Sequence, residues 1–235
     1  MRKAEVQVYS FDELSDEAKE RAHDNWIGKG HQHGWFYEAR DTIKALEREL
    51  GLSISDWSYD SYRYDYSVKF PDWMSDALEL RGNRARGWLW SHYGHLILSP
   101  SCHYWTHHEG KLIKAVAADS RKFVSKCFFD RCYDGTCPLT GVCFDCDALD
   151  PLAYFCFGVR WDDKEKRRVP SCRKLSVDND NTVESVLREC VESLFAALKR
   201  DCEWEETMEH FAELCECNEW EFTEDGDVWT EKEVA

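Results

Sequence analysis

The spacing of apolar and polar positions changes several times along the chain, and each change predicts a different element. In HGWFYEARDTIKALERELG (residues 33–51), apolar residues recur at helical spacing, which predicts a helix. LSDEAKERAHDNWIGKG (residues 14–30) also predicts a helix, because Asp16 and Glu17 suit its first turn and the glycines at 28 and 30 would end it. Ser15 is placed to cap this helix, and Gly51 is placed to end the other. The preceding stretch AEVQVYSF (residues 4–11) alternates and predicts a short strand.

The period changes to two in LSISDWSYDSYRYDYSVKF (residues 52–70), where alternate positions of the second half are large and apolar. YDSY supplies turn residues, so the stretch predicts an antiparallel hairpin. One strand face is almost wholly aromatic, and we expect the core or a partner to cover it. The residues of that face are Tyr62, Tyr64, Tyr66, Val68 and Phe70.

The middle of the chain mixes aromatic residues, histidines and cysteines, and its pattern is less regular. Residues 71–82 are predicted to form a short helix between a proline and a glycine. Two strands are predicted at 87–98 and 102–108, broken by SPS, and a third at 154–161. Residues 130–151 are predicted to be mostly loop.

The C-terminal quarter carries the longest apolar stripe. From Val183 to Cys215 the stripe keeps helical spacing without glycine or proline, which predicts either one long bent helix over 182–217 or two helices that break near Asp201. EWEFTEDGDVW (residues 219–229) then has the pattern of a small hairpin with Asp-Gly at its turn.

Together these elements predict one α+β domain over residues 1–235. We expect an antiparallel sheet packed against helices, followed by a long acidic C-terminal helix and a small hairpin. Residues 178–235 form the acidic helical C-terminal part of that domain.

Charge changes the picture most at this end. The formal net charge is −16, and residues 178–235 hold 19 Asp or Glu against 4 Lys or Arg, whereas residues 1–177 hold 27 against 26. Such an asymmetry predicts an acidic interaction surface and argues against direct nucleic-acid binding by this part. The carboxylates expected to bind a partner are Glu205, Glu206, Glu209, Glu213 and Glu216.

A row of carboxylates beside a helix can imitate the phosphates of DNA. The expected partner is therefore a host protein with a basic surface of the kind that binds nucleic acid. Tyr62, Tyr64 and Tyr66 are candidates for additional contact area, because aromatic side chains often anchor protein interfaces. The sequence leaves the formation of a homo-oligomer open.

Four cysteines lie close together in the middle of the chain. Cys132, Cys137, Cys143 and Cys146 are spaced C-x4-C-x5-C-x2-C, and a structural zinc site would need four such ligands, with His103, His107 or His108 as substitutes. Only the last pair has the usual spacing, so the pattern favours cysteines that pack as small apolar residues. Zinc remains the one cofactor that the sequence leaves open.

The sequence contains no H-E-x-x-H, G-x-S-x-G, P-loop or G-x-G-x-x-G motif, so we expect no enzymatic activity. It also lacks a run of 18 apolar residues and the apolar stretch of a signal peptide. These absences predict a protein that stays in the cytoplasm and does not enter a membrane.

Three short stretches are similar to a known group of proteins. YSFDELSDEAKERA (Tyr9–Ala22) and CNEWEFTEDGDVW (Cys217–Trp229) resemble the start and finish of a broad group of phage and prophage proteins, loosely labelled "antitoxin of toxin–antitoxin stability system". CPLTGVCFDCDALDP (Cys137–Pro151) resembles the middle of that group around its P-L-T-G turn. The resemblance implies that Gly141 has a positive φ and that Asp145 or Asp147 caps the helix or strand after the turn.

The resemblance implies no catalytic residues, but it suggests a setting. We expect a phage-encoded protein that binds and neutralises a host toxin or an antiphage-defence protein, such as a CRISPR or restriction effector. Presentation of an acidic, DNA-like surface is one way to do so. The alternative is a zinc-binding or metal-dependent nucleic-acid enzyme or module, built on the Cys/His-rich middle.

Overall fold

The computed structural model divides the chain into two compact units, and each is described by itself. Unit 1 comprises Met1–Phe36, Asp60–Tyr62 and Lys199–Ala235, and unit 2 comprises Tyr37–Tyr59 and Arg63–Leu198. The prediction of a single domain over 1–235 stays a prediction. The structure describes residues 7–28, 36–97, 103–108, 111–116, 128–130, 139–140, 144–157, 159–162, 167–170 and 180–229.

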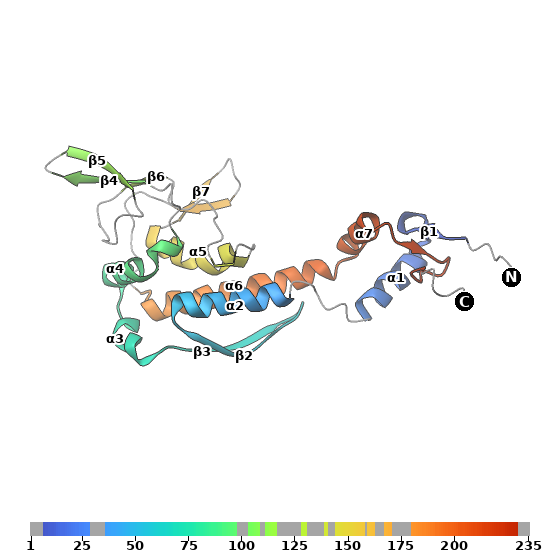
Figure 1. The fold of residues 1–235 in the computed structure, drawn as a ribbon, viewed down its shortest axis with the longest axis horizontal. Helices are drawn as coiled ribbons and strands as arrows, with labels where there is room; N and C mark the ends of the chain where they lie inside the picture. Colours follow the sequence, from blue (N-terminus) through green and yellow to red (C-terminus); the bar gives the residue numbers. More distant parts are fainter. Residues whose placement is uncertain are drawn as a thin grey trace. The chain divides into compact units, whose positions relative to one another are not determined.

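The predicted α+β class is confirmed, since helices and small antiparallel sheets alternate along the chain (Figure 1). The helices are η1 (Phe11–Glu13), α1 (Asp16–Gly28), α2 (Phe36–Leu50), η2 (Asp72–Met74), α3 (Ser75–Leu78), α4 (Gly82–Tyr93), η3 (Gly94–Leu96), α5 (Phe144–Phe157), α6 (Val183–Glu205) and α7 (Met208–Cys217). The strands are β1 (Tyr9–Ser10), β2 (Ser53–Tyr59), β3 (Tyr64–Lys69), β4 (His103–His108), β5 (Lys111–Val116), β6 (Phe128–Asp130), β7 (Val159–Asp162), β8 (Arg167–Pro170) and β9 (Glu221–Phe222).

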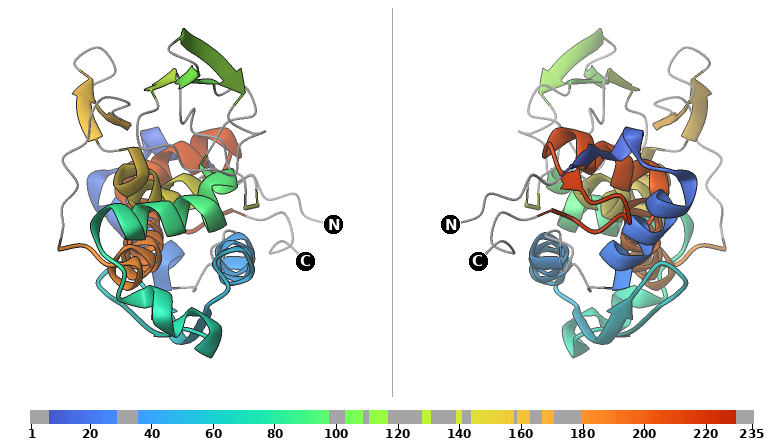
Figure 2. Two further views of the ribbon diagram at one scale, coloured as in Figure 1. Left: turned by 90° about the vertical axis from the view of Figure 1, so that its left-hand side faces the viewer. Right: turned by 90° about the vertical axis from the view of Figure 1, so that its right-hand side faces the viewer.

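Four of these helices and one hairpin build the core of unit 2. The hairpin β2–β3 covers one side of α2 and α6, and α4 and α5 lie on the other side (Figures 1 and 2). Ala39, Ile43, Leu46 and Leu50 on α2 are all buried, as their helical spacing predicts. Gly51 ends α2 with a φ of +66°, a conformation that glycine adopts without strain.

Within the aromatic face of the predicted hairpin, Tyr64 and Tyr66 point inward onto α6, whereas Tyr62 is exposed. The rings of Tyr64 and Tyr66 stack against buried Phe195, with centroid distances of 6.2 and 4.7 Å. Both hydroxyl groups donate to the carboxylate of Glu192, one turn before Phe195. The hairpin is therefore held by ring stacking and by two hydrogen bonds to one charged acceptor.

A buried carboxylate holds Leu139 and Thr140 to the start of α5. Asp145 is fully buried and accepts hydrogen bonds from the backbone N–H groups of Leu139 and Thr140 (2.8 and 2.7 Å) and from the Thr140 hydroxyl (2.9 Å). Buried Thr42 on α2 contacts the same hydroxyl at 3.2 Å. Asp145 thus satisfies the hydrogen-bond donors of Leu139 and Thr140, which precede α5. Gly141, which is expected to have a positive φ, lies outside the described residues.

One predicted strand is mostly helix instead, and another is helix in its first half. Residues 87–93 belong to α4 and not to a strand, because Ala85, Leu89 and Tyr93 are buried at four-residue spacing. Residues 154–157, predicted as the start of a strand, end α5, whose Leu149, Leu152 and Cys156 recur at helical spacing. Only β7 of that prediction is a strand.

The C-terminal stripe forms two helices, as one of the two alternatives predicts. The break falls at Glu206–Thr207, later than Asp201, and the Thr207 hydroxyl caps α7 by accepting the N–H of His210 at 3.1 Å. The final hairpin is confirmed by the bond from the Trp229 N–H to the Glu221 carbonyl (2.7 Å) and by a φ of +88° at Gly226.

Candidate functional site

The two ends of the chain meet in unit 1. β1 pairs with β9 in antiparallel register, Tyr9 opposite Phe222. The described core of this unit is small, and it packs the stretches Tyr9–Ala22 and Cys217–Trp229 against α7. Its buried members are Phe11, Leu14, Ala18, Ala22, Phe211, Cys215 and Phe222.

Close approach of the backbone fixes the C-terminal hairpin against α1. A Cβ atom added to Gly226 would lie 2.3 Å from the carbonyl oxygen of Ala18, so only glycine fits at this turn. Arg21 of α1 forms a 3.4 Å ion pair with Asp225, beside the same turn. Phe11 meets Phe211 edge-on, with centroids 5.2 Å apart, and this contact holds η1 against α7.

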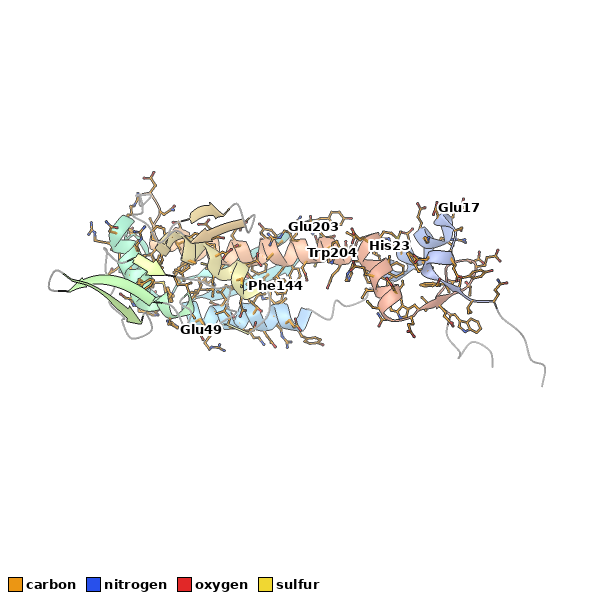
Figure 3. The ribbon with its side chains drawn as sticks, turned by 90° about the horizontal axis from the view of Figure 1, so that it is seen from above. Glu17, His23, Glu49, Phe144, Glu203 and Trp204 are labelled. Carbon is orange, nitrogen blue, oxygen red and sulfur yellow. The ribbon has the colours of Figure 1, made fainter. Side chains whose placement is uncertain are left out.

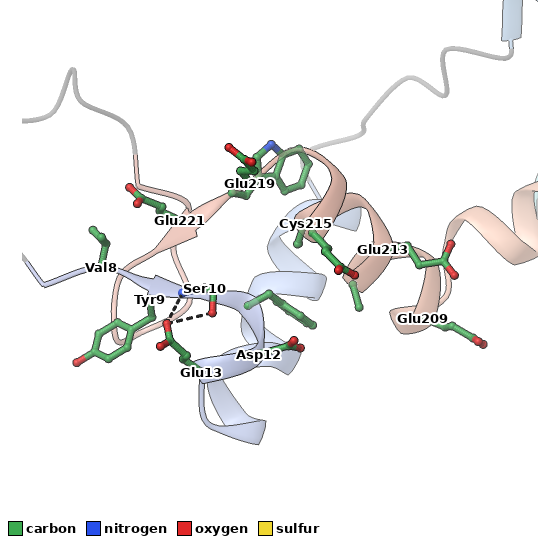
Figure 4. Close-up of a pocket in the computed structure, with 14 residues that line it drawn as sticks. Val8, Tyr9, Ser10, Asp12, Glu13, Glu209, Glu213, Cys215, Glu219 and Glu221 are labelled. Atoms are coloured by element: carbon green, nitrogen blue, oxygen red, sulfur yellow. Dashed lines mark hydrogen bonds between the residues drawn. The ribbon is translucent and has the colours of Figure 1, made fainter.

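A pocket of about 640 Å³ opens between η1, β1, α7 and the segment that enters β9 (Figure 4). Buried Phe11 and Cys215 and half-buried Ala212 and Trp220 contribute its apolar lining. Seven exposed carboxylate residues also line the pocket, and Figure 4 labels six of them, on η1, on α7 and around β9. The seven are Asp12, Glu13, Glu209, Glu213, Glu216, Glu219 and Glu221.

No lysine, arginine or histidine lines this pocket within the described part of the chain. Residues 201–229 carry twelve Asp or Glu and no Lys or Arg, so α7 and β9 bring no cation to neutralise the carboxylates. Glu13 accepts hydrogen bonds from the backbone N–H (2.8 Å) and the hydroxyl (3.0 Å) of Ser10. These bonds hold the pKa of Glu13 below its usual range, so it stays ionised.

Three of the five carboxylates expected from the sequence line this pocket together. Glu209, Glu213 and Glu216 lie at positions i, i+4 and i+7 of α7, which places them on one side of the helix. Glu206 is half-buried in the turn between α6 and α7, where its carbonyl oxygen lies 3.0 Å from Nε2 of His23. It does not line the pocket.

Glu205 does not share the exposed row of carboxylates on α7, and its role in partner binding stays a prediction. It lies on α6, before the helix break, and is only 5% exposed, whereas its neighbours Glu203 and Trp204 project into solvent (Figure 3). Burial raises the pKa of Glu205 to about 7, and the charges of Asp201 and Glu206 act in the same direction.

Four carboxylates of the pocket could not be chosen from the pattern of the C-terminal helix alone. Asp12 and Glu13 lie near the N-terminus, and Glu219 and Glu221 follow α7. Each of the four falls within Tyr9–Ala22 or Cys217–Trp229, two stretches near opposite ends of the chain. This shared location in two quoted stretches was a sequence signal from which the four carboxylates could have been assigned to one site.

The three tyrosines expected to contact a partner are placed differently from one another. Tyr62 is 86% exposed in the loop before β3. Tyr64 and Tyr66 are half-buried, and their rings and hydroxyls are engaged by Phe195 and Glu192. A role of these residues in partner binding stays a prediction.

The cysteine cluster lies mostly outside the described residues, which exclude Cys132, Cys137 and Cys143. Cys146 is a half-buried thiol on α5. Within the described ranges, no group of three or more His, Cys, Asp or Glu side chains is placed to hold a metal ion. In the same ranges, no helix has the length and apolar character needed to cross a membrane.

Comparison with protein-family models, with curated proteins and with solved structures found no match to this chain.

Proposed function

We propose that this protein is a phage-encoded binding protein, and that the pocket of unit 1 receives a basic segment of a host toxin or antiphage-defence protein. The observation that carries the proposal is that seven exposed carboxylate residues line one pocket that has no lining lysine or arginine among the described residues. Its setting is the cytoplasm of an infected or lysogenic bacterial host, which the resemblance of the chain's two ends to phage and prophage proteins supports.

The combination of an apolar lining and an acidic rim suits lysine and arginine side chains. Their aliphatic stems pack on apolar surface while the cationic ends stay at the rim, where carboxylates attract them. A pocket of about 640 Å³ has the size that proteins use to enclose a few side chains. Host proteins that bind nucleic acid present such basic segments. The pocket would neutralise such a protein by binding the lysines and arginines with which it contacts phosphates.

Charge reversal tests this proposal directly. Full-length protein is immobilised, incubated with host lysate at 0.05 M salt, and the captured protein is identified and purified. We expect the triple variant Glu209→Lys, Glu213→Lys, Glu216→Lys to bind the purified partner at least tenfold more weakly. Most of the loss should lie in the association rate, because rim charges act chiefly on encounter.

A matched control changes the same net charge elsewhere in unit 1. Glu20, Asp24 and Glu224 are exposed and lie outside the pocket lining, so their replacement by lysine should leave most of the affinity intact. Host cells that express each variant and carry the defence or toxin gene provide the functional readout. If the pocket variant binds and protects as well as the wild type, the proposal is wrong.

A further inference from the structure

A second surface, in unit 2, has the opposite charge character and an open aromatic stack. Arg84, Trp88 and His92 lie at positions i, i+4 and i+8 of α4, which places them on one side of the helix. Arg81, the residue before α4, and Trp73 of η2 complete what we call the α4 face. Arg81, Arg84, His92 and Trp73 are exposed, and Trp88 is half-buried.

The three rings of the α4 face are stacked and held in place. The rings of Trp88 and His92 lie 4.0 Å apart at 21°, and Nδ1 of His92 lies 2.8 Å from the Trp88 carbonyl oxygen. The Trp73 indole lies 6.4 Å from both rings, at 28° and 25°. Trp73 also packs over Gly51, where an added Cβ would lie 3.3 Å from Cζ2.

This stack leaves one of its two indole rings largely in solvent. Trp73 is 61% exposed, although its indole is already aligned with two other aromatic rings. A pre-aligned ring loses little conformational entropy when a further planar group stacks on it. The stack is therefore suited to a flat ligand, in contrast to Trp90, which is buried in the core.

Charge indicates which flat ligand fits. The chain carries 46 Asp or Glu, yet residues 80–108 contain none and include three arginines. Arg86 is buried and donates to the Phe155 carbonyl oxygen at 3.3 Å, so it does not belong to the face. Neither Arg81 nor Arg84 forms an ion pair with any residue that the structure describes.

Exposed acidic residues precede the α4 face in sequence, and Glu79 lies two residues before Arg81. Asp72 and Asp76 are exposed beside Trp73 along the chain, and Glu49 lies 3.8 Å from Nε2 of His95. Because no described carboxylate pairs with Arg81 or Arg84, an anion should meet the face at these two residues, while a neutral ring meets Trp73. A nucleotide chain supplies both groups in alternation.

We propose that the α4 face binds single-stranded nucleic acid, with a base stacked on Trp73 and neighbouring phosphates at Arg81 and Arg84. Stacking platforms combined with cations are the usual means of binding unpaired strands without sequence preference. A duplex keeps its base faces covered, so it offers phosphates but no ring to the stack. The inference concerns unit 2 alone and goes beyond the proposed function of the pocket in unit 1.

The test uses the full-length protein and a fluorescently labelled twelve-residue oligothymidylate, with binding followed by anisotropy at 0.05 M salt. Trp73→Ala should weaken binding roughly tenfold, the lower range of what one stacked base contributes. Arg84→Glu should also weaken binding and reduce the dependence of log affinity on log salt concentration by about one. Far-ultraviolet circular dichroism confirms that each variant is folded.

Two controls keep the outcome specific. Trp204→Ala removes a 43% exposed tryptophan of unit 1, and the triple pocket variant reverses charge there, so neither should reduce oligothymidylate binding through the α4 face. The proposal is overturned if no anisotropy change occurs, or if Trp73→Ala and Arg84→Glu bind as the wild type does. Equal affinity for a blunt duplex, or for a polyglutamate peptide with the same dependence on both residues, would also overturn it.

Discussion

The two units differ most in the balance between their net charge and the size of their hydrophobic core. Unit 1 holds 22 Asp or Glu against 8 Lys or Arg, and its described core has seven buried hydrophobic residues. Unit 2 holds 24 against 22, and its described core has 29. Unit 1 thus carries the larger excess of negative charge on the smaller hydrophobic core, so less burial of apolar surface offsets the repulsion between its carboxylates. Such an arrangement costs stability, and a function for the charge would account for it.

The difference also separates the means by which each unit holds its shape. Unit 2 relies on interlocking helices, with the hairpin fixed through Phe195 and Glu192. Unit 1 relies on a few backbone contacts between segments that are about 200 residues apart, such as β1 with β9. We therefore expect single changes to have sharper effects in unit 1 than in unit 2.

Gly226→Ala should have the largest effect. Its Cβ would lie 2.3 Å from the Ala18 carbonyl oxygen at a φ of +88°, so both the turn and α1 would have to shift. We expect a loss of about 3 kcal/mol or more in the free energy of unfolding of unit 1. Hydrogen exchange followed by mass spectrometry should show faster exchange over 208–222, while 183–198 stays protected.

Gly28→Ala is the matched control for that change, because a Cβ at Gly28 has no heavy atom within 4 Å. This variant should be neutral or slightly more stable, since alanine favours a helix more than glycine does. If Gly226→Ala accelerates exchange equally in 183–198, the two units unfold as one and the comparison fails.

Glu205 should make unit 1 sensitive to pH. Its pKa is raised from the ordinary 4.5 to about 7, so the folded state favours the protonated carboxyl. The stabilising contribution is complete below about pH 4.5 and is lost as pH rises through about 7. It amounts to about 3 kcal/mol at most.

Glu205→Gln should remove that pH dependence and stabilise unit 1 at pH 8. Urea unfolding of both proteins at pH 5.5 and pH 8 measures the change, with exposed Glu213→Gln as the control. Identical pH profiles for wild type and Glu205→Gln would show that this carboxyl is not responsible.

Tyr66→Phe tests the hairpin anchor of unit 2. The variant keeps the ring on Phe195 but removes one of the two donors to Glu192. Because Glu192 is exposed and keeps Tyr64 as a donor, we expect a loss of only about 1 kcal/mol. Tyr62→Phe, at an 86% exposed position, should change the urea midpoint by far less, and an equal shift in both variants would contradict the anchor.

The fold could be predicted from the sequence where one period dominated. The alternation of Tyr64, Tyr66 and Val68 predicted β3, and the spacing of Ile43, Leu46 and Leu50 predicted α2. In α4 and α5 many positions are apolar or aromatic, so helix and strand patterns overlap. In these two segments the helical conformation depends on tertiary packing, in which residues such as Leu89 and Leu149 are buried.

The candidate site was only partly visible from the sequence. The acidic row on α7 could be found from helical spacing, because Glu209, Glu213 and Glu216 are local neighbours. Pairing of β1 with β9 is a contact across more than 200 residues, and no local pattern specifies it. The buried position of Glu205 depended on where α6 ends, which the uninterrupted apolar stripe did not reveal.

The smallest expected effect concerns the charge of the two units directly. In the wild type, the carboxylates around the pocket repel one another, and added salt should relieve this as the Debye length falls from about 14 Å at 0.05 M to about 4 Å at 0.5 M. The triple lysine variant at 209, 213 and 216 should therefore be more stable than the wild type at low salt, by about 0.5–1 kcal/mol, and the difference should shrink at high salt. The same reversal at Asp65, Asp72 and Asp76, which are exposed in nearly neutral unit 2, should bring no such gain. Urea titrations of the three proteins at both salt concentrations, read by hydrogen exchange in each unit, measure these differences. An equal gain in unfolding free energy from both triple variants would mean that the net charge of the whole chain causes the effect. Local repulsion among the pocket carboxylates would then make no separate contribution.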